Sequence, residues 1–343
     1  MDSFDVVTLG APGAGTTMFL AAMFGQLQGG QPGNGPFLDI TLAQARMLQR
    51  ILAAASDPQG GWPDTTPPSP VPEWEFTCCV RSAGRIFEVF GINYLDFAGG
   101  RLQQVLDGDA ETGRRFQQRV TSAHALLGVL DGLALRYLLD DDPRAERLVS
   151  LGMRTIFRIM RTHARGRPIH FIVTKWDLLA DAYELGDVRA KLMEFGDFAA
   201  LVQSARSGPP GAPAPLVRLI PVSALGFGFA QLDEEGRVRK TGAAAASPIN
   251  AEIPLIALPI DVLAQAPQAQ AAQAQAPQAA QAAQGQAPQA AQGHGPAGVV
   301  DQRSALRETV RSFRRQLDRF EERYPAALPD RQSAGDWSPP EAR

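Results

Sequence analysis

Short apolar runs alternate along the chain with longer segments in which apolar residues recur at helical spacing. The short runs are typical of buried strands, and the longer segments are typical of helices that cover a sheet. Predicted strands occupy 4–9, 74–81, 85–96, 124–130, 169–173 and 216–222, and predicted helices occupy 16–27, 40–55, 143–164 and 187–205. Because strands and helices alternate, we expect an α/β fold with a mostly parallel sheet flanked by helices.

Three segments depart from this alternation. Residues 28–36 and 57–72 are rich in glycine and proline, so the first is expected to end a helix and the second to form a long loop. A later apolar run at 253–260 is predicted to add a loop or an edge strand, although Pro254 and Pro259 argue against a strand inside the sheet.

The C-terminal part of the chain changes character. Residues 264–298 are almost entirely alanine, glutamine and proline, which cannot build a core. Beyond them, apolar residues step by four and three positions, which predicts an amphipathic helix over about 302–323; they are Leu306, Val310, Phe313, Leu317 and Phe320. This helix either packs back on the domain or binds a partner at the end of a tether.

These features divide the chain into four parts. We expect a domain at 1–263 with a long insert region at 28–72, a low-complexity linker at 264–300, an amphipathic helix at 301–324 and a disordered tail at 325–343.

Composition narrows the range of functions. A formal net charge of −3 does not favour binding to nucleic acid or to a lipid surface. The adjacent Cys78 and Cys79 point to opposite faces of a strand, so they do not form a disulfide framework. We find neither a secretory leader nor an apolar stretch long enough for a membrane span, so a cytoplasmic protein is expected. The four histidines show no metal-binding spacing, which favours structural or solvated roles.

The first candidate site is "GAPGAGTT" at 10–17. It has the spacing G-x-x-x-x-G-K-[ST] of a phosphate-binding loop, with Thr16 in place of the lysine. A strand before it and a helix after it would direct the backbone N–H groups of 13–17, Ala14 among them, toward phosphate oxygens, and the Thr17 hydroxyl toward Mg²⁺. The alternative is a glycine-rich turn without a ligand.

Two further motifs also follow predicted strands. Asp96 and Gly99 fit D-x-x-G, in which the carboxylate holds Mg²⁺ through water and the glycine amide reaches the terminal phosphate. Alone, this pattern usually marks a turn. Thr174, Lys175 and Asp177 fit [NT]-K-x-D, in which the carboxylate accepts two hydrogen bonds from guanine. The alternative is a helix start capped by Asp177, which needs neither Lys175 nor the strand before it.

The fourth motif is Ser223-Ala224-Leu225, which resembles a loop whose backbone amide contacts guanine O6. All four motifs stand in order at the carboxyl ends of predicted strands, where ligands bind in open α/β sheets.

With these motifs the chain resembles a P-loop GTPase of the translation-factor-like (TRAFAC) class from Asp5 to about Ser223, and its first loop is similar to that of bacterial double-GTPase-type domains. The resemblance implies a three-layer regulatory module that binds GTP or GDP with Mg²⁺ and is often encoded beside partner proteins. It places Gly10, Gly13, Gly15 and Thr17 on the phosphates and Asp96 with Gly99 on Mg²⁺ and the γ-phosphate. It assigns Lys175, Asp177, Ser223 and Ala224 to the base.

The catalytic residues are the least determined part of this assignment. Thr65 or Thr66 is the best candidate for a switch threonine, and Gly99 is a further weak candidate. Gly100 stands where many GTPases carry a glutamine that orients water, and Thr16 removes a cation whose loss typically costs about 3 kcal/mol. The sequence therefore supports nucleotide binding more directly than hydrolysis.

Three functions follow from these patterns. The first is a GTP-dependent switch whose switch segments or C-terminal helix are read by a protein partner. The second is a pseudo-GTPase that acts as a scaffold. The third, an ATPase or kinase, leaves the segment at 174–177 without a use.

Overall fold

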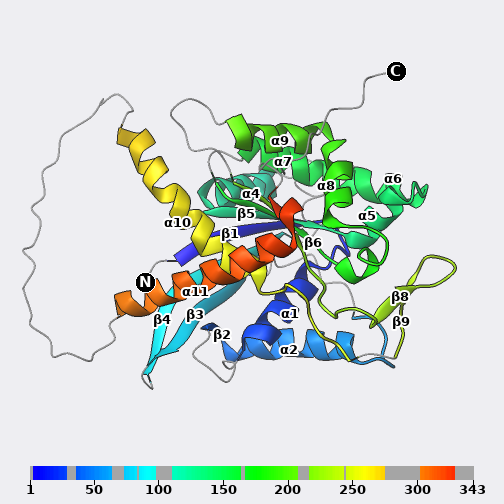
Figure 1. Ribbon diagram of the computed structural model, residues 1–343, viewed down its shortest axis with the longest axis horizontal. Helices are drawn as coiled ribbons and strands as arrows, with labels where there is room; N and C mark the ends of the chain where they lie inside the picture. Colours follow the sequence, from blue (N-terminus) through cyan, green and yellow to red (C-terminus); the bar gives the residue numbers. More distant parts are fainter. Residues whose placement is uncertain are drawn as a thin grey trace, which may run out of the picture.

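The protein is described here by a computed structural model covering 3–28, 36–63, 73–82, 85–97, 110–163, 167–207, 216–242, 245–274 and 302–328. Seven strands form a central sheet in the order β2-β3-β4-β1-β5-β6-β7, with helices on both faces (Figure 1). Strand bounds are β1 Ser3–Gly10, β2 Pro36–Asp39, β3 Glu73–Ser82, β4 Arg85–Phe97, β5 Ala125–Leu130, β6 Ile169–Val173 and β7 Val217–Pro221. The predicted α/β fold with a mostly parallel sheet is confirmed.

Strand β1 lies at the centre of the sheet and runs parallel to both neighbours, β4 and β5. β6 and β7 extend the parallel part, whereas β3 and β2 pair antiparallel beyond β4. The chain therefore leaves β1 toward one side and returns to its other side, so β1 marks the point where the strand order reverses. Open α/β sheets bind their ligands at such a point, outside the carboxyl ends of the strands.

Helices cover the sheet in two layers. Phe171 of β6 packs against Phe157 and Phe198 of helices α7 and α9 on one face, while Phe90 of β4 packs against Phe313 of α11. The helices are α1 Thr16–Leu27, α2 Leu42–Ser56, α4 Ala110–Ser122, α5 Gly132–Leu139, α6 Arg144–Leu148, α7 Arg154–His163, α8 Leu185–Met193, α9 Gly196–Ser207, α10 Ile253–Ala274 and α11 Gln302–Arg323.

Helix prediction was accurate for α1, which is apolar on nearly all sides, and for α11, whose apolar stripe repeats at helical spacing. The segment at 143–164 instead contains a π-turn, η1 (Val149–Met153), between α6 and α7, and the segment at 187–205 is split between α8 and α9. The short strand β2, the helices α4 and α5, and the hairpin of β8 (Ala230–Leu232) and β9 (Val238–Lys240) were not predicted.

The prediction of a loop or edge strand at 253–260 is wrong. These residues open α10, and Leu255, Ile256 and Leu258 are buried in the core. A continuous apolar run has no periodicity that separates a buried helix from a buried strand. Pro254 is tolerated because it occupies the first turn, where its missing N–H has no helical partner. The helix also continues to Ala274, past the expected start of the linker at 264.

The C-terminal helix packs back on the domain, which confirms the first of the two alternatives. Phe313 and Leu317 of α11 are fully buried, and α11 lies across β3 and β4 (Figure 1). The chain stays packed beyond α11, because Pro325–Ala327 forms a 3₁₀ turn, η3, and Ala327 and Leu328 are buried. The predicted disordered tail at 325–343 is therefore wrong for 325–328, and 329–343 lies outside the described residues.

A buried polar network joins the C-terminal helices to the amino ends of β6 and β7. Asp261 of α10 accepts hydrogen bonds from Arg218, and its Oδ2 lies 2.8 Å from Nε2 of His170. Arg218 also donates to Glu321 of α11 at 2.7 Å. His170 thus has a structural role, as expected for a histidine without metal spacing. Burial lowers the pKa of His170 despite its carboxylate neighbour.

Across the described ranges, none of the helices combines the length and the apolar character that crossing a membrane requires.

Candidate nucleotide-binding site

The glycine-rich loop at 10–17 joins the end of β1 to the start of α1, at the point where the strand order reverses. Gly13 and Gly15 have φ angles of 78° and 90°, in the left-handed region that glycine adopts without strain. A Cβ atom on Gly10 would lie 2.6 Å from the Thr16 hydroxyl oxygen, which is too close for any side chain. Local backbone geometry therefore favours glycine at each of the three positions, and together they let the backbone turn tightly before the start of α1.

Thr16 points into the protein rather than into the loop's opening. Its side chain is buried, with the hydroxyl beside Gly10. The position that carries lysine in the usual pattern therefore packs beneath the loop and offers no positive charge. Thr17 follows it in the first turn of α1 and is half-buried.

The segment at 174–177 contacts the glycine-rich loop directly. The Thr174 hydroxyl donates to the carbonyl oxygens of Ala14 at 2.6 Å and Leu130 at 3.1 Å. The ammonium of Lys175 donates to the Gly13 carbonyl at 3.0 Å. Two motifs about 160 positions apart in the sequence are thus held together, because β1 and β6 end at the same edge of the sheet.

Asp131 is a residue of the site that the sequence analysis missed. Its carboxylate lies 2.8 Å from the Lys175 ammonium and also caps α5 by accepting from the Leu133 N–H at 2.9 Å. Lys175 has a φ of 50°, a left-handed conformation that non-glycine residues seldom adopt. The signal available in the sequence was a carboxylate immediately after the β5 run, at the same sheet edge as the other motifs.

Asp177 and Ser223 form a second contact within the site. The Ser223 hydroxyl donates to Asp177 Oδ1 at 2.6 Å and accepts from the Gly226 N–H at 2.8 Å. Burial raises the pKa of Asp177, and the hydrogen bond from Ser223 opposes that shift. Because the backbone N–H of Ser223 bonds Ile249, a ligand contact from this loop has to come from a later amide, such as that of Ala224 or Leu225.

Asp96 ends β4 beside β1, where it is paired in register with Thr8. Its side chain is 1% exposed, and neither carboxylate oxygen has a hydrogen-bond partner among the described residues. Burial raises the pKa of Asp96 to about 7. Buried polar atoms are almost always paired, so this carboxylate calls for a cation or a hydrogen-bond donor from beyond the described residues.

The remaining predicted residues, Thr65, Thr66 and Gly99, lie outside the described residues. Within those residues, no group of three or more histidine, cysteine, aspartate or glutamate side chains could hold a metal ion. Asp96 and Thr17 carry oxygen atoms of the kind that Mg²⁺ takes as ligands, and this ion usually takes one or two protein ligands and completes its shell with water and phosphate oxygens.

The described site thus brings together the glycine-rich loop, the 174–177 segment, Asp177 with Ser223, and an unpartnered carboxylate at the end of β4. Comparison with protein-family models and with curated proteins found no match to this chain.

Proposed function

We propose that this protein is a guanine-nucleotide-binding switch of the P-loop GTPase type, which takes GTP or GDP with Mg²⁺. The observation that carries the proposal is the direct attachment of the 174–177 segment to the glycine-rich loop through Thr174 and Lys175. A capped helix start needs neither contact. In a nucleotide site these contacts would keep the phosphate-binding and base-binding segments at a fixed separation, which is required because phosphates and base belong to one ligand.

The phosphates would lie against the backbone of the glycine-rich loop. Gly13 is exposed, and no atom lies within 4 Å of the position of a Cβ built on it, so the approach to the loop is open there. The loop ends at the N-terminus of α1, where unpaired N–H groups and the helix dipole favour anions.

The base would be selected by Asp177. Its carboxylate is oriented by Ser223 and only partly enclosed, so an oxygen remains to accept from guanine N1–H and the exocyclic amine. Adenine lacks that pair of donors, so it would leave the half-buried carboxylate without hydrogen-bond partners, which disfavours its binding.

Mg²⁺ would be held by the Thr17 hydroxyl and, through water, by Asp96. Bound Mg²⁺ neutralises charge between the β- and γ-phosphates. The Asp96 oxygens have no hydrogen-bond partner among the described residues, which supports this role, because the ion would supply the buried carboxylate with a positively charged partner.

Binding is supported better than hydrolysis. Thr16 is buried and uncharged, and the Lys175 ammonium is already engaged by Gly13 and Asp131. Hydrolysis is therefore proposed to be weak or dependent on a protein partner. The same observations favour a second candidate, a pseudo-GTPase scaffold that keeps the fold and does not use nucleotide.

Titration with fluorescently labelled GTP, GDP and ATP, with and without Mg²⁺, separates these functions. We expect micromolar GTP binding that needs Mg²⁺ and is lost in Asp177→Ala. Asp181→Ala is the matched control, because this nearby aspartate is 72% exposed and pairs only with Arg136 among the described residues. No binding of any nucleotide would favour the scaffold, and a preference for ATP would overturn the assignment of the base site.

A further inference from the structure

Helix α11 carries a row of arginines along its exposed side. Arginine recurs at every fourth position, which places successive side chains next to one another on the helix surface. The members are Arg307, Arg311, Arg315, Arg319 and Arg323, and all five are exposed. We call these residues the arginine row.

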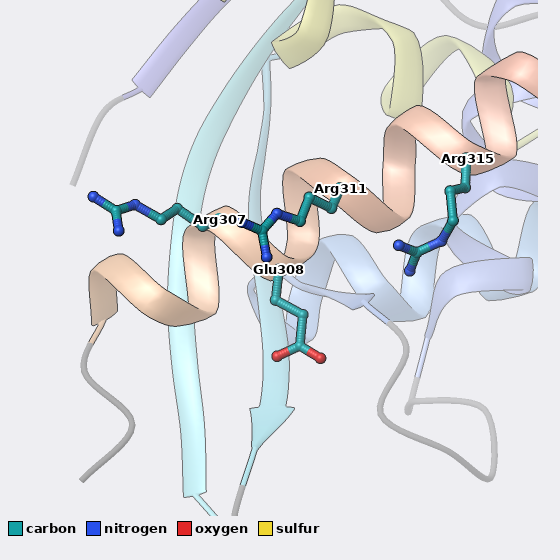
Figure 2. A pocket seen from close by; sticks show the side chains of 4 residues that line it. All are labelled: Arg307, Glu308, Arg311 and Arg315. Carbon is teal, nitrogen blue, oxygen red and sulfur yellow. The ribbon is translucent and has the colours of Figure 1, made fainter. Parts of the chain in front are cut away.

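The first half of the row borders a surface pocket of about 450 Å³, lined by Arg307, Glu308, Arg311 and Arg315. Figure 2 shows the guanidinium of Arg311 above the carboxylate of Glu308, with Arg315 one turn further along α11. Within the described part of the chain, the pocket's three arginines form no ion pair, whereas the neighbouring Arg314 pairs with Asp318 at 3.0 Å. Three arginines and one glutamate thus line the pocket, which gives its described lining a net positive charge.

The surroundings of the pocket favour a protein partner over a lipid surface or a nucleic acid. A membrane-surface helix needs an apolar face free to enter the lipid, but Phe313, Leu317 and Phe320 of α11 are buried against the protein. The formal charge of −3 gives no general attraction for nucleic acid. Glu308 repels phosphates and carboxylates alike, but it can accept a hydrogen bond from a peptide N–H, a donor that a phosphate backbone lacks.

We propose that the pocket on α11 is a docking surface for an acidic segment of a protein partner, with Arg307, Arg311 and Arg315 each receiving a carboxylate. Four residues along a helix span about 6 Å. Alternate side chains on one face of an extended peptide lie about 6.7 Å apart. Acidic residues at every second position of an extended segment therefore match the spacing of the arginines.

Such a surface binds through several weak contacts. Exposed ion pairs contribute little individually and are screened by salt, so affinity depends on engaging the three arginines together and falls as ionic strength rises. The proposal does not depend on nucleotide binding, because α11 contributes no residue to the candidate nucleotide site.

The probe is a fluorescein-labelled peptide of alternating glutamate and alanine with three glutamates, followed by fluorescence anisotropy at low salt. A peptide with glutamine in place of glutamate is its control. We expect saturable binding of the glutamate peptide alone. Arg307→Gln/Arg311→Gln/Arg315→Gln should weaken it about tenfold or more. Glu308→Gln should strengthen it by removing a like charge.

The matched control is Arg46→Gln/Arg50→Gln/Arg158→Gln, which removes the same charge from exposed positions of α2 and α7. We expect it to bind as the wild type does, with both triple variants giving the wild-type circular dichroism spectrum. An equal loss in the two triple variants would show a general charge effect and overturn the proposal. Tighter binding to phosphatidylserine vesicles or to a DNA duplex than to the peptide, at equal concentration of negative charge, would also overturn it.

Discussion

The ammonium of Lys175 bridges the carbonyl oxygen of Gly13, at 3.0 Å, and the carboxylate of Asp131, at 2.8 Å. One side chain thereby fixes the glycine-rich loop relative to the ends of β5 and β6. Because its ammonium is engaged in these two contacts, Lys175 holds the loop in position and does not replace the lysine missing at position 16.

Asp131→Asn should remove the ion pair with Lys175 and keep the cap of α5. Asparagine caps a helix as well as aspartate does, so the free energy of unfolding should change by less than about 1 kcal/mol. Loss of the negative charge frees Lys175 from Asp131, and we expect GTP affinity to fall about fivefold as the loop loses its tether. Equilibrium nucleotide titration and urea unfolding measure the two effects.

Asp131→Ala is the companion variant, because it removes both the ion pair and the cap. We expect it to reduce stability by a further ~1 kcal/mol relative to Asp131→Asn, with a similar loss of affinity. If Asp131→Asn binds GTP as tightly as the wild type, Asp131 has only its capping role.

Thr16→Lys should restore the missing cation. We expect triphosphate binding to tighten about tenfold or more, because a lysine stem can leave the space beside Gly10 and reach the phosphates. Thr16→Met is the control, since it adds length without charge and should not tighten binding. Equal affinities for the wild type and Thr16→Lys, in variants that unfold at the same temperature, would mean that the loop does not hold phosphates.

The sequence predicted which segments meet at this site, but not how they are held. Four motifs at the carboxyl ends of parallel strands have to share one sheet edge, and the structure does bring Thr174 to Ala14 and Ser223 to Asp177. Asp131 escaped prediction because a carboxylate after a strand has the same signature as an ordinary helix cap. The structure shows its partner, because the Lys175 ammonium, from beyond the end of strand β6, lies 2.8 Å from the Asp131 carboxylate.

In the fold, too, elements with a local sequence period were predicted, whereas elements without one and contacts between distant residues were not. Helix α11 was predicted to its observed bounds because its apolar stripe repeats every three to four residues. Helix α10 was not, because an unbroken apolar run with two prolines carries no period. The network of His170, Asp261 and Arg218 joins residues as far as 91 positions apart, and no local pattern marks such a contact.

Asp96 should make the stability of the ligand-free protein depend on pH. Its pKa is about 7 in the folded protein, above the ordinary value of 3.8. The folded state therefore binds more protons than the unfolded state between these values, and this group lowers stability as pH rises from about 4 to 7. Without Mg²⁺, Asp96→Asn should be more stable than the wild type at pH 8 by a few kcal/mol and nearly equal to it at pH 4.

Urea unfolding at the two pH values, without nucleotide, tests this prediction, and nucleotide titration gives the second readout. Asp96→Asn should lose the Mg²⁺-dependent part of GTP binding although it is the more stable protein. A variant less stable than the wild type at pH 8 would show that the carboxylate is satisfied in the folded state.

Asp261→Asn should destabilise the fold far more than the loss of an exposed ion pair does. Arg218 and Asp261 are both buried, and removing one charge leaves Arg218 with Glu321 as its one ion-pair partner among the described residues. We therefore expect a loss of about 3–5 kcal/mol. Asp318→Asn breaks the exposed pair with Arg314 on α11 and should cost less than about 1 kcal/mol. Equal unfolding midpoints for the two variants in urea would refute the anchoring role of the buried network. Because that network lies at the amino ends of β6 and β7, opposite the proposed nucleotide site, GTP affinity in the folded Asp261→Asn protein should stay within about twofold of the wild type.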